Sequence, residues 1–220
     1  MTQGLRRVLR WLETIGAPRI ADQLPKLPVP QPRERIATHE ESAKILAEAS
    51  PEMRCFILLV VDCGFRFSEA LSAAPEFYDP LHQTITVRTK GGRYHTVPVS
   101  PQLQDIFAAA RDPDTSKPFV EQLSRHGHFG RGAARTQWEA LQRIAGIREN
   151  LRIHDLRRTT AVNLYEDTKD LRAVQELLGH KSLSSTFHYL AHRDANKLRP
   201  LMRTIWTPHK KTGPPGEPQK

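Results

Sequence analysis

Cysteine is scarce in this chain, and long apolar runs are missing. Only two of the 220 residues are cysteines, Cys55 and Cys63, and both fall in one apolar stretch, so neither a disulfide framework nor a cysteine zinc site is indicated. The longest apolar run, residues 55–61, is far too short to cross a bilayer, and the N-terminus lacks the pattern of a signal peptide. We therefore expect a cytoplasmic protein with no membrane partner.

Acidic side chains are the minority among the charged ones. The chain has 33 Lys and Arg against 24 Asp and Glu, which gives a formal net charge of +9. This excess favours a polyanionic partner, because basic side chains that neutralise phosphates release counterions. Nucleic acid is the first candidate, although a basic protein without a specific nucleic-acid partner would show the same balance.

Prolines divide the chain near its N-terminus. Apolar residues from Leu5 to Ile15 recur at helical spacing and predict one short amphipathic helix within residues 1–16. Residues 17–37 are basic and rich in proline, which excludes a continuous helix and predicts an extended linker. The length of the chain suits one principal domain, which we expect over residues 38–206, followed by a disordered tail over residues 207–220.

Most of the principal domain is expected to be helical. Thr38 and Glu41 form a capping box, while Ser50 and Ser100 are each an N-cap followed by a proline that suits the first helical turn. Gly64 predicts a C-cap, ahead of a short helix that restarts at residue 68. Further helical patterns cover residues 132–144, 154–166, 170–178, 184–190 and 195–206.

A β-hairpin is expected in the middle of the domain. Residues 83–88 and 93–99 are rich in β-branched side chains, and the pair Gly91 and Gly92 lies between them. The expected fold class is therefore α+β, mainly α, with a small antiparallel hairpin or sheet.

Four segments hold the side chains of interest: CGFRFSEAL (63–71), RTKGGRYHTVPV (88–99), IHDLRRT (153–159) and LLGHKSLSSTFHYLAH (177–192). Their content and order resemble the tyrosine recombinase (phage integrase) family. That family's pattern is an Arg in a G-x-R-x-S-E context, a Lys in a β-hairpin, H-x-x-R on a helix, L-G-H ahead of another helix, and a Tyr shortly after. The resemblance covers residues 38–206 and implies the family's catalytic domain, a DNA breaking-rejoining fold.

The resemblance implies a site-specific recombinase or integrase that cuts and rejoins double-stranded DNA through a 3′-phosphotyrosine intermediate. It implies neither a metal nor any other cofactor. Matched onto this sequence residue by residue, the family's catalytic positions are Arg66, Lys90, His154, Arg157, His180 and Tyr189.

These residue types also suit transesterification of a phosphodiester on chemical grounds. Two guanidiniums would neutralise the negative charge on the non-bridging oxygens, and His154 and Arg157, three residues apart on a helix, share a face. Helical geometry alone leaves Arg158 open, and the family pattern selects Arg157. A phenol with a pKa of about 10 needs help to ionise at neutral pH, so His154 would accept its proton. His180 would donate a hydrogen bond to a non-bridging oxygen, and Lys90 would protonate the departing 5′ oxygen.

Each assignment has a plainer structural alternative. Arg66 could be a helix-start residue that pairs with Glu69, and Gly179 with His180 could form only a helix C-cap with a cation near the helix dipole. A metal site built on some of the ten histidines is the chemical rival. No acidic or cysteine ligand recurs at zinc spacing around them, so we expect no metal.

A group of arginines just ahead of the His154 segment predicts contacts with DNA phosphates. Arg131 and Arg135 fall on one face of the helix expected over residues 132–144, and Trp138 marks its apolar side. A solvated basic face is the alternative. The expected DNA-binding residues are Arg125, Arg131, Arg135, Arg143 and Arg152.

The resemblance also has implications for assembly. The family places a helical core-binding domain before the catalytic one and works as a tetramer on DNA, so we expect a homo-oligomer on double-stranded DNA, in the nucleoid. Few residues precede the domain here, and residues 1–16 are expected to be the last helix of a missing or truncated core-binding domain. The competing functions are a DNA-binding accessory module without catalysis and a relaxase similar to type IB topoisomerases.

Overall fold

The computed structural model describes residues 2–20, 22–23, 35–89, 92–110, 114, 116–180, 182 and 186. Contacts between residues divide the chain into two units, residues 1–33 and residues 34–220. Among the described residues, none of the helices combines the length and apolar character that crossing a membrane requires.

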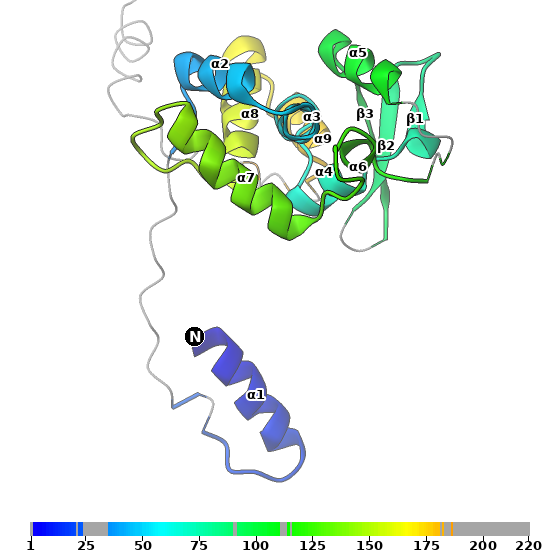
Figure 1. The fold of residues 1–220 in the computed structure, drawn as a ribbon. Coiled ribbons are helices and arrows are strands. Elements are labelled where there is room, and N and C mark those ends of the chain that lie inside the picture. The colour runs from blue at the N-terminus through cyan, green and yellow to red at the C-terminus, as the bar shows by residue number, and fades with distance from the viewer. Residues whose placement is uncertain are drawn as a thin grey trace, which may run out of the picture. The chain divides into compact units, whose positions relative to one another are not determined.

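The described part of the first unit contains the helix α1 (Thr2–Thr14), drawn in dark blue in Figure 1. This helix confirms the amphipathic segment expected there. Its apolar side chains are accessible, since Leu5 is 49 % and Trp11 is 61 % exposed. An ion pair of 3.2 Å between Arg10 and Asp22 connects the helix to the residues that follow it.

Three helices in the second unit begin at the predicted N-caps. The helix α2 (His39–Glu48) starts after Thr38, whose hydroxyl accepts from the Glu41 amide at 3.1 Å, while the Glu41 carboxylate accepts from the Thr38 amide at 2.9 Å. The helices α3 (Pro51–Val61) and α5 (Pro101–Ala109) start after Ser50 and Ser100, each with proline in the first turn. These side chains bind amides that have no partner within the helix, so the starts are set locally.

The helix α3 forms the centre of the core. It is buried on nearly every side, as expected for a helix that is apolar all round. It contacts α4 (Phe67–Ser72), α5, α6 (Phe119–Gln122), α7 (Arg131–Ile144) and α8 (Ile153–Thr168). Figure 1 shows α3 almost end-on, with α2, α7 and α8 on one side and the sheet on the other. Cys55 and Cys63 are free and buried in this core, as expected of small packing residues.

The described residues form one antiparallel sheet in the order β1 (Tyr78–Asp79), β2 (Thr84–Arg88), β3 (Tyr94–Pro98). Strands β2 and β3 confirm the predicted hairpin, with Val87 opposite His95. The buried side chains of Ile85, Val87 and Val97 attach one face of the hairpin to the core. Strand β1 was not predicted, because two residues are too few to show an alternating pattern.

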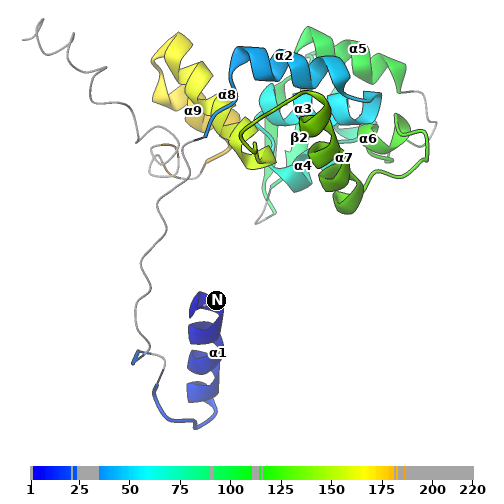
Figure 2. The ribbon, with the colours of Figure 1, turned by 60° about the vertical axis from the view of Figure 1, so that its left-hand side comes forward.

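The remaining helices agree with the sequence patterns, with small shifts at their ends. Helices α7, α8 and α9 (Leu171–Leu178) correspond to the expected ranges 132–144, 154–166 and 170–178. Figure 2 shows α8 and α9 side by side at one edge of the second unit, where they pack against each other. The short α6 and the 3-10 turn Pro75–Phe77 were not expected. The expected helices over 184–190 and 195–206, the tail and much of the linker lie outside the described residues.

Candidate active site

Arg157 lies at the centre of the candidate site and is almost completely enclosed, with only 2 % of its side chain exposed. Helix α8 carries it to a point where two other segments end. Its guanidinium donates to the carbonyl of Gly64, which follows α3, and to the carbonyl of Leu178 at 2.6 Å, where α9 ends. Arg157 therefore joins three segments that are far apart in the sequence.

The close approach at Arg157 depends on a glycine. Gly64 has a φ of +62°, and a Cβ built there would lie 2.9 Å from Cδ2 of Leu178. A side chain would both strain the backbone and clash with α9. The sequence predicted Gly64 as a helix C-cap, but the C-cap of α3 is Asp62, and Gly64 instead brings its carbonyl to Arg157.

The carboxylate of Glu69 lies between Arg66 and Arg157 and contacts both. It is 3 % exposed and accepts from the Arg66 backbone amide at 2.8 Å and from Nη1 of Arg66 at 3.0 Å. It also lies 4.0 Å from Nη1 of Arg157. The ion pair of Arg66 with Glu69, which was the structural alternative for Arg66, is thus present. The same carboxylate also lies near the guanidinium of Arg157. Because two guanidiniums share one carboxylate and Arg66 is 36 % exposed, positive charge remains available at the surface.

His180 follows α9 and contacts Arg157. Its Nε2 lies 3.3 Å from Nη2 of Arg157, and its Nδ1 lies 3.1 Å from the hydroxyl of Thr186. Burial lowers the pKa of His180 to about 4, and the charges of Arg157 and Arg66 act in the same direction. The ring is therefore neutral at pH 7, and since a guanidinium only donates, Nε2 accepts and Nδ1 donates to Thr186. A neutral ring does not fit the alternative of a cation held at the end of α9.

His154 lies in the first turn of α8, three residues before Arg157. Burial lowers the pKa of His154 below its usual value, and the charges of Arg157, Arg66 and Arg158 act in the same direction, while Asp155 opposes them. A neutral imidazole at pH 7 can accept a proton. Contacts and shared electrostatic effects thus bring together four of the predicted catalytic residues: Arg66, His154, Arg157 and His180.

The lowered pKa of His180 makes folding stability depend on pH. The imidazole titrates near 6.5 in the unfolded chain and near 4 in the folded one, so between these values the unfolded state binds more protons. The contribution of the neutral His180 to the free energy of unfolding is fully present above pH 6.5 and is lost as the pH falls toward 4. We expect a loss on the order of 1 kcal/mol between pH 7.5 and pH 5, measured by urea unfolding. His180→Asn should reduce this pH dependence. An unchanged dependence would show that the titration of His180 is not its cause.

The hairpin next to the site is anchored to α9. From β3, Nε2 of His95 lies 3.0 Å from the carbonyl of Leu177. Its ring also packs on Gly179, where an added Cβ would lie 3.1 Å from the imidazole. Gly179 has a φ of +59° and caps α9, so this glycine serves both the helix end and the contact. The sequence did not single out His95, since a contact between a strand and a distant helix leaves no local pattern.

An open cavity of about 540 Å³ lies between the hairpin and α9 and reaches His180. Thr89 and Arg93 line this cavity, the Thr89 amide donates to the Arg93 carbonyl at 2.7 Å, and the Gly92 amide donates to the Thr89 carbonyl at 3.0 Å. Lys90 itself lies outside the described residues, as does the predicted nucleophile Tyr189. Their positions therefore stay predictions. In the part of the chain that is described, no three His, Cys, Asp or Glu side chains group as metal ligands would.

The arginines predicted to bind DNA are all exposed. Arg131, at the start of α7, lies over the ring of Phe67 at 5.1 Å from its centroid, and Phe67 directly follows Arg66 in the chain. Arg135 and Arg152 line a depression beside the same ring. Basic side chains of α7 thus extend from the candidate site, and their contact with DNA stays a prediction.

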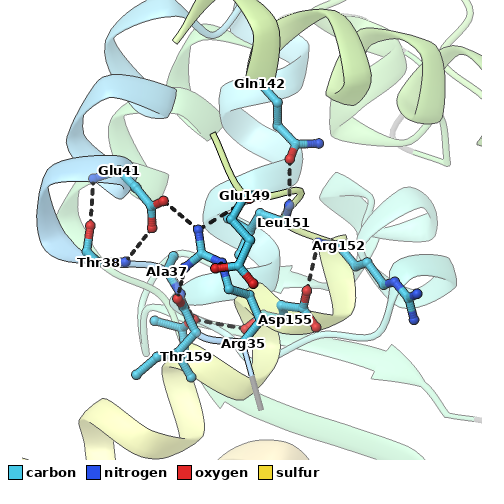
Figure 3. Close-up of polar contacts among 11 residues, drawn as sticks. Arg35, Ala37, Thr38, Glu41, Gln142, Glu149, Leu151, Arg152, Asp155 and Thr159 are labelled. Atoms are coloured by element: carbon cyan, nitrogen blue, oxygen red, sulfur yellow. Dashed lines mark hydrogen bonds and ion pairs between the residues drawn. The ribbon is translucent and has the colours of Figure 1, made fainter. Parts of the chain in front are cut away.

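The turn between α7 and α8 is held by side chains of α7. The Trp138 ring nitrogen donates to the Leu151 carbonyl at 2.7 Å, and the Leu151 amide donates to Oε1 of Gln142 at 2.7 Å. The Arg152 amide then donates to Oδ2 of Asp155 at 2.8 Å, which caps α8. Figure 3 shows the last two contacts. The sequence identified Trp138 only as an apolar marker, but its ring nitrogen also supports the start of the helix that carries His154.

The mainly helical domain with its small antiparallel sheet has the fold of solved integrase catalytic domains. The chain covers 98 % of the solved catalytic domain of bacteriophage HP1 integrase, over 81 % of its own length, with a TM-score of 0.57 and 19 % sequence identity. The Tn1549 transposon integrase, solved in complex with a circular intermediate DNA, matches with a TM-score of 0.68 and 16 % identity over 93 % of this chain and 77 % of that one. These likenesses confirm the expected fold.

The particular family follows from the sequence. The model of the phage integrase family matches residues 35–196, so the chain belongs to this family. The tyrosine recombinase XerC of Rhodospirillum centenum is 32 % identical over 205 residues, which cover 84 % of this chain and 59 % of that protein. The chain therefore spans less than two thirds of the length of this relative.

Proposed function

We propose that this protein cleaves and rejoins double-stranded DNA at specific sites as a tyrosine recombinase, through a covalent 3′-phosphotyrosine at Tyr189. The observation that carries the proposal is the enclosed contact of Arg157 with Glu69 and His180, beside the partly exposed Arg66, in a member of the phage integrase family. The XerC relative is named a tyrosine recombinase, and the Tn1549 integrase was solved with DNA.

The two guanidiniums are suited to a phosphodiester under attack. Arginine stays protonated at every working pH, and its planar fork matches two phosphate oxygens. Arg157 is already fixed by backbone carbonyls, so little reorganisation is needed when charge develops on the phosphate. Arg66 is partly exposed to solvent and would contact the phosphate first. Both cations lower the energy of the pentacovalent transition state.

The proposed bond changes are simple and balanced. The Tyr189 oxygen attacks the phosphorus, and its proton passes to neutral His154. The bond from phosphorus to the 5′ oxygen breaks, and Lys90 protonates that oxygen, because an alkoxide is too basic to leave unaided. The phosphotyrosine conserves the energy of the broken ester, so a 5′ hydroxyl of another strand reverses the chemistry without a cofactor. His180 would donate from Nε2 to a non-bridging oxygen in the neutral tautomer that carries the ring proton on Nε2.

The proposed partner is double-stranded DNA, bound along the arginines of α7 and at the cavity beside the hairpin. In this proposal residues 38–206 are the catalytic domain, residues 1–16 are the last helix of a core-binding domain, and residues 17–37 link them. The active assembly would be a tetramer on two duplexes, located with the DNA of the cell.

The direct test is covalent capture on a duplex that carries a nick next to the cleavage point, so that the cleaved end diffuses away. We expect an adduct that resists denaturant and forms equally in EDTA, and digestion followed by mass spectrometry should find the nucleotide on Tyr189. An adduct on another residue, or cleavage that EDTA abolishes, contradicts the proposal. Relaxation of arbitrary supercoiled plasmids by the monomer would instead support a relaxase similar to type IB topoisomerases.

A further inference from the structure

The segment that leads into α2 is fastened to the turn before α8 through Arg35 (Figure 3). Only 10 % of the Arg35 side chain is exposed. Its Nη2 lies 2.5 Å from Oε1 of Glu41 in α2, and its Nε lies 3.3 Å from Oε2 of Glu149 in the turn between α7 and α8. Nη2 also donates to the backbone carbonyl of Glu149 at 3.4 Å. One guanidinium therefore ties α2 to this turn.

A second connection starts two residues later, at Ala37. The Ala37 amide donates to the hydroxyl of Thr159 at 2.8 Å, and this hydroxyl donates to the carbonyl of Asp155 at 2.8 Å. Ala37 and Thr159 are both buried. The leading segment thus contacts the first two turns of α8 directly, in addition to the turn before it.

Carboxylates surround the guanidinium of Arg35. The hydrogen bond with Glu41 raises the pKa of Arg35 and outweighs the opposing effect of burial, and the charges of Glu41, Glu149 and Asp155 raise this pKa further. These three carboxylates come from α2, from the turn and from α8. Without the guanidinium, like charges from three elements would face one another, and the turn would lose its attachment to α2.

Helix α8 carries two of the predicted catalytic side chains. Arg157 is held from outside the helix by Gly64 and Leu178. His154 stands in the first turn of α8, two residues after the N-cap Arg152 that ends the turn of residues 145–152. The first turn of a helix has amides without partners inside the helix, so its geometry depends on contacts from outside.

We infer that Arg35 is a positioning residue: it locks the turn of residues 145–152 against α2 and so fixes the direction in which α8 presents His154. This inference rests on the proposed function for its effect on cleavage, but its effect on the helix start does not depend on that function. A displacement of about 1 Å of a reacting group costs on the order of 100-fold in rate, so a loosened turn should slow cleavage.

The test compares Arg35→Gln with a matched control, Thr38→Ala, in the full chain. The first removes the guanidinium, and the second removes the Thr38 hydroxyl that caps α2 but leaves Arg35 and the turn unchanged. We expect amide hydrogen exchange of residues 151–156 to accelerate at least about tenfold in Arg35→Gln and to stay as in the unmodified protein in Thr38→Ala. On the nicked duplex at saturating DNA, Arg35→Gln should cleave about 10- to 100-fold more slowly with unchanged DNA affinity.

A milder variant covers the case in which Arg35→Gln does not fold. Glu149→Ala removes a side chain that is 73 % exposed, so the fold should survive, and exchange at residues 151–156 should accelerate to a smaller extent. Unchanged exchange there in Arg35→Gln, or in Glu149→Ala when Arg35→Gln does not fold, overturns the inference, and so does equal acceleration in Thr38→Ala. A lack of covalent adduct in the unmodified protein overturns the proposed function instead, and hydrogen exchange still decides the role of Arg35.

Discussion

Tyr189→Phe is expected to abolish the covalent adduct with DNA, by at least about 10⁴-fold, while DNA affinity stays unchanged. The substitution removes one oxygen, and that oxygen is the proposed nucleophile. Ionising a phenol with a pKa of about 10 at pH 7 costs on the order of 4 kcal/mol, so an unassisted tyrosine reacts poorly. A neutral His154 and the positive charges of Arg66 and Arg157 are the assistance that the site offers. Adducts on the nicked duplex are counted on a denaturing gel.

Two other tyrosines of the second unit serve as controls for this substitution. Tyr165 lies in α8, and Tyr78 packs its ring on Phe107 with the centroids 5.0 Å apart. Tyr165→Phe and Tyr78→Phe remove the same atom, so their adduct yields should stay within about twofold of the unmodified protein, as is usual for substitutions away from the chemistry. An adduct that persists in Tyr189→Phe and disappears in either control would move the nucleophile to another tyrosine.

Arg157→Ala is expected to damage both folding and cleavage. It leaves the buried Glu69 without its second guanidinium and the carbonyls of Gly64 and Leu178 without a donor. Removing one member of a buried ion pair costs about 3 to 5 kcal/mol, which lowers the unfolding midpoint of a chain of this size by roughly 10 °C. Adduct formation should fall below detection. Thermal unfolding and the cleavage assay measure the two effects separately.

Arg66→Gln is the matched variant that separates charge at the phosphate from support of the fold. Arg66 is 36 % exposed, and its guanidinium contacts Glu69 at the edge of the site, so its loss should cost at most about 1 kcal/mol of stability. Cleavage should still fall about 100- to 1000-fold, as for other lost donors to a developing negative charge. Equal loss of stability in Arg157→Ala and Arg66→Gln would contradict the structural role of Arg157. Normal cleavage by Arg66→Gln would contradict the role of Arg66 at the phosphate.

Local signals predicted most of the secondary structure. A Ser or Thr N-cap acts within one helical turn, so the starts of α2, α3 and α5 could be predicted from Thr38, Ser50 and Ser100 alone. The hairpin followed from its β-branched strands and intervening glycines. The strand β1 and the helix α6 are too short for a periodic pattern, and each exists because a longer neighbour packs against it.

For the candidate site, the sequence by itself determined which functional groups are present and that His154 and Arg157 share one face of a helix, because spacing along a helix is a local property. Only the tertiary structure decided that Arg157 contacts Gly64, 93 residues away, and His180, 23 residues away. It also decided that Arg35 and Glu149, 114 residues apart, hold one turn together. Contacts of this kind depend on how the helices pack around α3. Packing brings together residues from distant segments, and no local sequence pattern predicts such contacts.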